Sequence, residues 1–269
     1  MSEVPERVLY EREAGLALIT LNRPDRLNAL SGPVMDQLLA YVQAAADDRS
    51  VRAVLLRGAG RAFCAGGDMK SGSGNREELA QMTPEDRTAQ LRRRMEAANL
   101  MHAMPKPTVS ALRGAVMGAG VGLGLSADFR IASTTLNINT AFTALGFSGD
   151  YGGAYFLTRL AGVSAARELM MRSRKVGADE ALKLGLVTRL VADEELDEAA
   201  LNLARELAAG PGVAFQHMKR ALNAAADGAS CAQVLDLEAA AMVRTAETAD
   251  HKEAVRAFVD KRKPDFSGR

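Results

Sequence analysis

Two glycine-rich stretches, each directly after a predicted buried strand, most constrain how this chain folds. The first covers residues 58–67 and follows a strand expected at 51–57, and the second covers 114–124 and follows a strand expected at 108–112. Glycine lets a turn adopt positive φ and lets a ligand or another segment approach the backbone. Strand, glycine turn and helix in that order are typical of α/β proteins. We therefore predict an α/β fold.

The rest of the chain divides into an alternating part and a helical part. A hairpin is expected at 8–10 and 16–21, a helix at 34–47 and a further strand at 129–133, which completes an alternating first half. Helices dominate afterwards, over residues 164–172, 178–184, 194–208, 213–225, 230–249 and 251–261. We predict a core over residues 1–200 and a C-terminal helical region over 201–269.

Composition excludes several classes of protein. The 269 residues carry 34 Lys plus Arg against 33 Asp plus Glu, so a net charge of +1 gives no field that would attract nucleic acid. The apolar runs are too short to span a bilayer, and the start lacks the apolar region of a signal peptide. We expect a cytoplasmic protein without a metal site, in which Cys64 and Cys231 are free thiols.

Both glycine-rich stretches are suited to holding an oxygen anion, although simpler interpretations exist. The first contains Phe63-Cys64-Ala65-Gly66-Gly67-Asp68, which on spacing alone is more typical of a strand-to-helix turn capped by Asp68. The second opens a helix, whose free N–H groups and dipole favour negative charge. A dinucleotide site is disfavoured, because the glycine spacing is poor and the strand at 129–133 does not end in an acidic residue.

Five motifs in series resemble the crotonase family of enoyl-CoA hydratases and isomerases over nearly the whole chain. They are Asn22-Arg23-Pro24-Asp25-Arg26-Leu27-Asn28-Ala29-Leu30, Phe63 to Asp68, Gly114-Ala115-Val116-Met117-Gly118-Ala119-Gly120, Gly185-Leu186-Val187 and Phe258-Val259-Asp260-Lys261-Arg262-Lys263-Pro264. The resemblance implies a spiral of strand–strand–helix turns, followed by helices that build a trimer or a dimer of trimers.

The resemblance also implies a site for an acyl-CoA thioester, with CoA entering as part of the substrate and no further cofactor. The backbone N–H groups of Ala65 and Ala119 are expected to hold the thioester oxygen when an enolate forms. The remaining substrate-binding residues expected from the motifs are Arg26, Ala29, Gly66, Gly67, Asp68, Lys70, Gly118, Phe258 and Lys261, the last two in a neighbouring subunit.

The acid and base residues depart from the family pattern. Two glutamates activate water in the typical hydratase, and the matching positions here hold Gly122 and Phe142, with Phe142 expected to shape the acyl pocket. Asp150 is the candidate replacement, although it could instead cap the following helix. We expect it to lie among Phe142, Phe147, Tyr151 and Tyr155, whose apolar surroundings would raise its pKa.

The resulting hypothesis is an enolate mechanism with Asp150 as a proton shuttle, and double-bond isomerisation as the activity. Alternatives within the family are hydration, hydrolysis or dehalogenation. Water activation could use Asp150, or one of Glu77, Glu78 and Glu85, whereas dehalogenation needs a helper such as His102, for which packing is the simpler role. The alternative from another class is an inactive crotonase-like RNA-binding protein, which the balanced charge disfavours.

Overall fold

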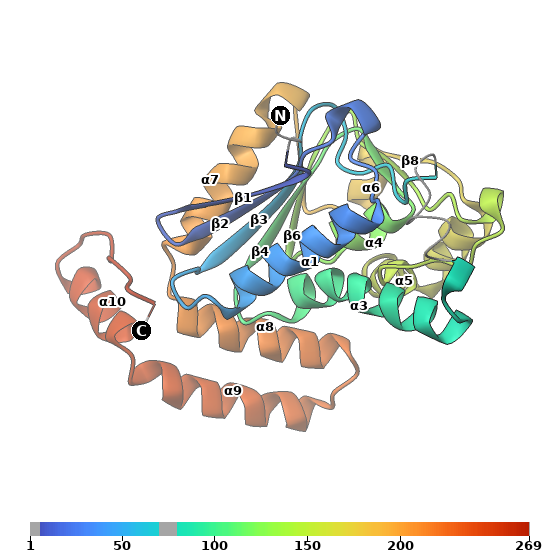
Figure 1. Cartoon of the computed structure of the whole chain (residues 1–269). Coiled ribbons are helices and arrows are strands. Elements are labelled where there is room, and N and C mark those ends of the chain that lie inside the picture. Colours follow the sequence, from blue (N-terminus) through green and yellow to red (C-terminus); the bar gives the residue numbers. More distant parts are fainter. Residues whose placement is uncertain (1–5, 70–79, 269) are drawn as a thin grey trace.

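Two sheets form the centre of the computed structural model, which describes residues 6–69 and 80–268 (Figure 1). The larger sheet has the strand order β1-β2-β3-β4-β6-β9, with β1 antiparallel to β2 and every other pair parallel. Its strands are β1 (Val8–Glu13), β2 (Leu16–Leu21), β3 (Ala53–Gly58), β4 (Thr108–Leu112), β6 (Phe129–Ser133) and β9 (Arg189–Val191). The smaller sheet consists of β5 (Ala115–Met117), β7 (Asn137–Asn139) and β8 (Val176–Gly177).

The two sheets are joined by repeated strand–strand–helix units. The chain leaves β4 in the larger sheet, forms β5 in the smaller one and enters α4 (Ala119–Leu125); it then repeats this course through β6, β7 and α5 (Gly153–Arg172). Because β5 and β7 are parallel neighbours, successive units stack on one another. The predicted α/β spiral is confirmed.

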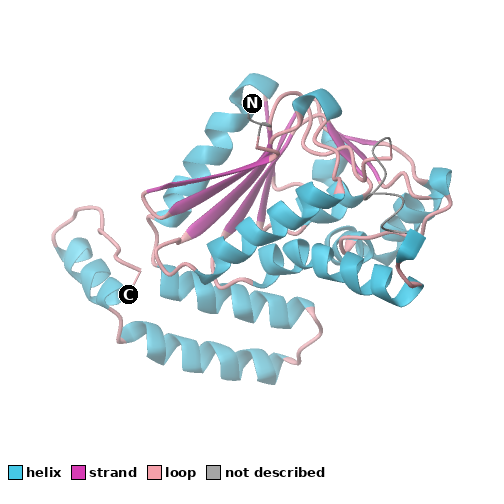
Figure 2. Cartoon of the chain, viewed as in Figure 1, coloured by secondary structure: helices cyan, strands magenta, loops and turns pink. Residues whose placement is uncertain are grey.

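Helices cover both faces of the larger sheet, as the colouring by secondary structure shows (Figure 2). On one face lie α1 (Gly32–Asp47) and α3 (Pro84–Ala103), whose buried side chains join those of α4 and α5 in the main hydrophobic core. The other face is covered by α7 (Leu196–Ala208), which buries Leu196, Ala200 and Ala204 against strand residues such as Leu55 and Val109. Short elements complete the chain: η1 (Pro24–Arg26), η2 (Thr143–Leu145), α6 (Ala178–Lys183) and η3 (Asp193–Glu195).

The expected domain boundary at residue 200 is wrong, because it falls inside α7. That helix packs on the sheet and so belongs to the core. The helical region begins after it, with α8 (Gly212–Ala226), α9 (Cys231–Ala246) and α10 (Ala249–Val259). In Figure 1 α8 lies next to the core, whereas α9 and α10 lie farther from the sheet. In the described part of the chain, no helix has both the length and the apolar character that a bilayer crossing requires.

One helix begins earlier than the sequence indicates. The apolar pattern predicts a helix over 164–172, whereas α5 runs from Gly153 with a kink at Gly162, where φ is 80°. Glycines at the start and at the kink weaken the helical pattern in the sequence. Packing of Phe156 and Leu157 in the core stabilises the early turns.

Candidate active site

The two glycine-rich stretches, which are about fifty residues apart in sequence, lie against each other. Cys64 N–H donates to the Ala115 carbonyl (3.0 Å), and Met117 N–H donates to the Cys64 carbonyl (2.9 Å). Gly66 has a φ of +86°, and a Cβ there would lie 2.9 Å from the Met117 oxygen, which only glycine avoids. The first stretch therefore extends the smaller sheet beside the entry to α4.

The backbone donors of the first stretch differ from the expectation. Ala65 N–H donates to the Leu27 carbonyl (2.9 Å), so the prediction that it is free to hold an oxyanion is wrong. Leu30 N–H donates to the Gly66 carbonyl (2.7 Å), and Asp68 N–H donates to the Leu30 carbonyl (3.0 Å). These two hydrogen bonds form a parallel bridge between Leu30 and Gly67. The N–H of Gly67 points away from Leu30, because donors and acceptors alternate along a strand. Gly67 N–H has no partner among the described residues, and Gly67 is exposed.

The second donor lies at the start of α4. Gly118 N–H donates to the Asn139 carbonyl (3.0 Å), and Val121 N–H donates back to the Gly118 carbonyl (2.9 Å). Between them Ala119 is the first residue of the helix, where N–H groups lack an intrahelical partner. Within residues 6–69 and 80–268, Ala119 N–H has no acceptor. Gly67 and Ala119 are thus unpaired donors, one from each of the two adjoining stretches, among the described residues.

Asp150 lies next to this region with its carboxylate unsatisfied. Its Oδ1 atom is buried and has no hydrogen-bond partner among the described residues, and burial raises the pKa of the carboxyl group from 3.8 to about 6. Burial also raises the pKa of the Cys64 thiol to about 12, and the charge of Asp150 adds to that rise, so the two groups share one buried region. The capping alternative fails, because Gly152 is the N-cap of α5 and no side chain caps it.

Gly122 explains why the Asp150 segment sits so close to α4. A Cβ at Gly122 would lie 2.2 Å from the Tyr151 carbonyl oxygen, and a glutamate there would displace this backbone. The ring of Phe142 lies between Gly118 and Gly149, with one atom 3.8 Å from the position that a Cβ of Gly118 would take and another 3.7 Å from that of Gly149. The segment carrying Asp150 therefore occupies space that a larger residue at position 122 would take.

The expected cluster of four aromatic rings around Asp150 does not form. Phe142 and Tyr151 are buried, whereas Phe147 is 56% exposed. Tyr155 faces another set of groups and donates its hydroxyl to Asp227 (2.5 Å). Burial by the surrounding core as a whole, rather than by these four rings, accounts for the raised pKa of Asp150.

Asp68 makes a structural contact within the chain. Its buried carboxylate forms an ion pair with Arg23 (2.9 Å), and Arg23 also donates to the Ala29 carbonyl (2.7 Å). Asn28, which is fully buried, donates to the carbonyls of Ala59 (3.0 Å) and Ala62 (2.7 Å). The first motif thus ties down the first glycine-rich stretch, a role that the sequence did not reveal.

The expected CoA-binding residues are not brought together by one chain. Arg26 is exposed on η1, 3.7 Å from Asp25, while Ala29 is buried nearby. Phe258 is 85% exposed and, like Lys261, lies at the end of α10, far from α4 and α5 in Figure 1. Lys70 lies outside the described residues, as do Glu77 and Glu78.

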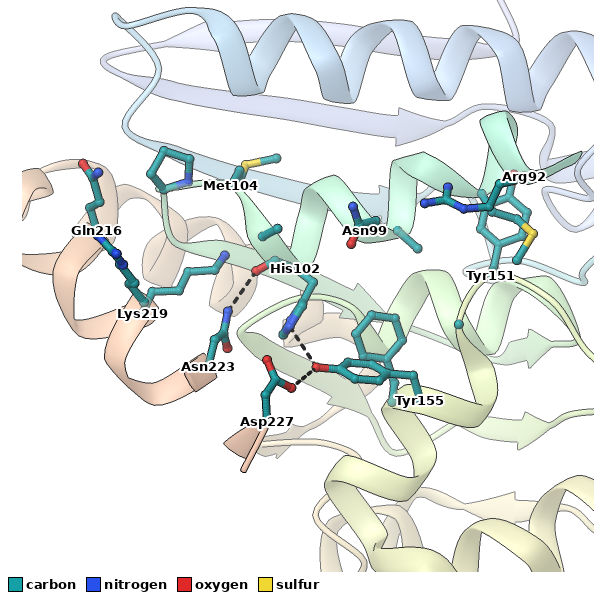
Figure 3. A pocket seen from close by; sticks show the side chains of 17 residues that line it. Arg92, Asn99, His102, Met104, Tyr151, Tyr155, Gln216, Lys219, Asn223 and Asp227 are labelled. Atoms are coloured by element: carbon teal, nitrogen blue, oxygen red, sulfur yellow. Dashed lines mark hydrogen bonds between the residues drawn. The ribbon is translucent and has the colours of Figure 1, made fainter. Parts of the chain in front are cut away.

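A cleft of about 720 Å³ opens beside Asp150, between α3, the start of α5 and α8 (Figure 3). Tyr151 and Gly152, which directly follow Asp150, line one end of it. Its volume is typical of a small-molecule site. Among the described residues no group of three His, Cys, Asp or Glu side chains is placed to bind a metal ion.

The similarity of this chain to known proteins shows the family to which it belongs. A sequence model of the enoyl-CoA hydratase/isomerase family matches residues 11–269. The chain belongs to this family. The solved structures agree, since a Mycobacterium abscessus protein described as an enoyl-CoA hydratase/isomerase superposes with a TM-score of 0.89 at 36% identity, over 97% of this chain and all (100%) of that one.

Curated members of the enoyl-CoA hydratase/isomerase family carry names of both activities. A Rhodobacter capsulatus protein named "Probable enoyl-CoA hydratase" is 36% identical over 97% of this chain and 98% of its own length. The "1,2-epoxyphenylacetyl-CoA isomerase" of Escherichia coli is 34% identical over 98% of this chain and 99% of its own length. This chain is thus similar to enzymes of the enoyl-CoA hydratase and isomerase kind, and the choice between them depends on its own residues.

Proposed function

We propose that this protein isomerises the double bond of an enoyl-CoA thioester, with Asp150 as the single proton shuttle. The carboxylate removes a proton from the carbon next to the thioester of a 3-enoyl group, and the electron pair moves onto the thioester oxygen. The same carboxyl group then returns the proton to the γ carbon, which leaves the 2-enoyl isomer. One acid–base residue is sufficient for this transfer.

The N–H groups of Gly67 and Ala119 would hold the enolate oxygen. Both are unpaired among the described residues, and both belong to stretches fixed against each other by backbone hydrogen bonds. Such preorganised donors need no rearrangement as negative charge develops, and each contributes about 2.7–4 kcal/mol. Gly67 takes the place that the sequence assigned to Ala65.

The observation that carries the proposal is the Oδ1 atom of Asp150, which is buried and has no hydrogen-bond partner among the described residues. Burial raises the pKa of Asp150 to about 6, which suits a base that must accept a proton and release it again near neutral pH. A buried polar atom without a partner is costly unless a ligand or water satisfies it. The proton of a substrate bound in the adjoining cleft is a suitable partner.

Hydration is the second candidate, because the Rhodobacter capsulatus relative is named as a hydratase. It requires water to be positioned by carboxylates, and positions 122 and 142 hold glycine and phenylalanine. Glu85, the remaining described candidate, lies in the exposed first turn of α3. These residues favour isomerisation over hydration.

The test compares the unmodified enzyme with Asp150→Asn on 3-enoyl-CoA, 2-enoyl-CoA and aryl-CoA thioesters. We expect conversion of 3-enoyl-CoA to the conjugated isomer, which absorbs in the ultraviolet, and a loss of about 10²–10⁴-fold in the variant. Unchanged turnover by Asp150→Asn would disprove the role of this residue. Faster hydration of 2-enoyl-CoA than isomerisation would favour the second candidate, and tight RNA binding in a gel shift without any turnover would favour the RNA-binding alternative.

We further propose that the C-terminal helices assemble the protein into a trimer or a pair of trimers. An apolar groove of about 770 Å³ between α8 and α9 is lined by residues such as Met218, Leu222 and Met242, which are exposed in the single chain. Large exposed apolar surfaces are typical of protein interfaces. Assembly would also supply Phe258 and Lys261 to the CoA of a neighbouring subunit. The cytoplasmic location and the absence of a separate cofactor stay predictions.

A further inference from the structure

The cleft beside Asp150 is lined by both apolar and polar side chains, and its wall around His102 is polar (Figure 3). Tyr151 and Gly152 form the end nearest the proposed shuttle. Met95, Ala98 and Phe156 supply apolar surface to the cleft, and Arg92 and Asn99 of α3 supply polar groups. Farther along, His102, Tyr155 and Asp227 point toward one another from three different segments. A chain that enters past Asp150 therefore meets the polar groups of His102, Tyr155 and Asp227 farther along the cleft.

The polar wall is built by a hydrogen-bond network with fixed geometry. Tyr155 donates its hydroxyl to Asp227 (2.5 Å) and accepts a hydrogen bond from Arg159 (2.9 Å). Arg159 also forms an ion pair with Asp227, and it donates to the Asn223 carbonyl (3.2 Å). Residues of α5 are thereby joined to the end of α8 across the cleft, so the wall is held in place before any ligand arrives.

His102 is the member of this wall with hydrogen-bonding capacity to spare. Its only side-chain hydrogen bond among the described residues is a long one, 3.5 Å from Nε2 to the Tyr155 hydroxyl. Burial, followed by the charges of Arg159 and Lys219, lowers the pKa of His102, which favours the neutral ring. Since Tyr155 gives its hydroxyl proton to Asp227, Nε2 of His102 donates to the Tyr155 oxygen, and Nδ1 remains as an acceptor that is free with respect to the described residues. Arg220 also lines the cleft, and no acidic partner is found for it in the described part of the chain.

A plain alkyl chain suits this wall poorly. It would displace water from His102 and its neighbours without replacing the lost hydrogen bonds, which costs free energy. A hydroxyl group at the end of the acyl chain would restore them, because it can donate to the free ring nitrogen of His102. We propose that the preferred substrates are acyl-CoA thioesters whose acyl group carries a hydroxyl at its far end. This inference rests on the proposed function for the direction in which the acyl chain enters.

The experiment measures binding, so that it does not depend on turnover. Isothermal titration calorimetry compares saturated acyl-CoA thioesters of six to twelve carbons with the same chains bearing a terminal hydroxyl. At the length that reaches the wall, we expect the hydroxylated chain to bind about fivefold to tenfold more tightly, the effect of one well-formed hydrogen bond. His102→Leu should reduce this ratio to about one, and His102→Gln should retain part of it.

Met171→Leu is the matched control, because Met171 is exposed on α5 outside the cleft, and its ratio should equal that of the unmodified protein. Thermal unfolding of each variant checks that the fold is kept. Equal or weaker binding of every hydroxylated chain would overturn the inference, as would a ratio unaffected by His102→Leu. Failure of the proposed function is a separate result, namely absence of 3-enoyl-CoA turnover whatever the binding ratio.

Discussion

Two apolar helices of this chain have opposite environments. The seven residues of α4, Ala119–Leu125, are all buried, whereas α9, Cys231–Ala246, has sixteen residues and buries none of them. The sequence of α9 is nevertheless rich in Ala, Leu, Val and Met. The difference teaches that one chain completes the core that holds the reactive groups but leaves the apolar face of its last helices open.

The contrast follows from how each helix is packed. Glycines 120, 122 and 124 let α4 approach Cys64, Tyr151 and Leu112 at distances that a side chain would not allow. In contrast, α9 packs on α8 and leaves Leu235 and Met242 exposed. We expect changes in α4 to alter chemistry and changes in α9 to alter assembly.

We expect the largest effect from charges placed on the exposed apolar groove between α8 and α9, because they should prevent assembly. The double change Leu235→Glu and Met242→Glu places charges on the groove between α8 and α9, and burying them in an interface is costly. Light scattering after gel filtration should change from a multiple of three times the 28.6 kDa chain to a single chain. Val163→Glu, on an exposed position of α5, should leave the mass unchanged. A monomeric unmodified protein would contradict this prediction.

The next largest effect is expected from a substitution in the buried helix α4. Gly122→Ala places a methyl group 2.2 Å from the Tyr151 carbonyl and so must displace the segment that carries Asp150. We expect a hundredfold or greater loss of kcat/KM and a destabilisation of about 1–3 kcal/mol from overpacking. Gly177→Ala is the control, because a methyl group there meets no atom of the described residues within 4 Å. Near-normal activity of Gly122→Ala would show that this close contact does not set the position of Asp150.

Lys219 connects the C-terminal helices to the core, and a substitution there should weaken this connection. This buried residue of α8 forms an ion pair with Asp128 (2.8 Å) and donates to the Lys106 carbonyl (3.0 Å). Lys219→Met leaves the carboxylate of Asp128 without its counter-charge, and loss of one partner of a buried pair costs about 3–5 kcal/mol. Urea unfolding should show this decrease, and the double variant Lys219→Met, Asp128→Asn should recover part of it. Equal stability of both variants would mean that the pair does not fasten α8.

The smallest expected effect is a pH dependence of the stability, which is caused by Asp150 beside α4. Because burial raises the pKa of Asp150 from 3.8 to about 6, ionisation destabilises the fold: the stability is highest below pH 3.8 and is lost as the pH rises through 6. Asp150→Asn should therefore gain about 1–2 kcal/mol relative to the unmodified protein between pH 5 and pH 8. Over the same interval kcat/KM of the unmodified enzyme should rise, because the base must be ionised. A pH-independent difference in stability would contradict the raised pKa.

Individual residues show which parts of the candidate site could be predicted from the sequence. Asp150 was identified because it is the acidic residue in a motif that otherwise lacks one, and its burial was expected. The choice of Ala65 over Gly67 failed, because neighbouring residues of one turn differ only in which way their N–H groups point. Asp68 was expected to cap a helix or to bind substrate, and Asn28 was given no role, yet both hold the turn, Asp68 through Arg23 and Asn28 through two backbone carbonyls.

The sequence by itself determined the alternation of strands and helices, because apolar periodicity and glycine spacing are local properties that a linear chain records. Its five motifs carried the resemblance that implied the spiral, the family and Asp150 as the proposed shuttle. Only the tertiary structure decided which N–H groups stay unpaired, that α7 belongs to the core and that His102 meets Tyr155 across a cleft. Hydrogen bonds between segments far apart in the chain depend on distances and directions, and these exist only after the segments have packed.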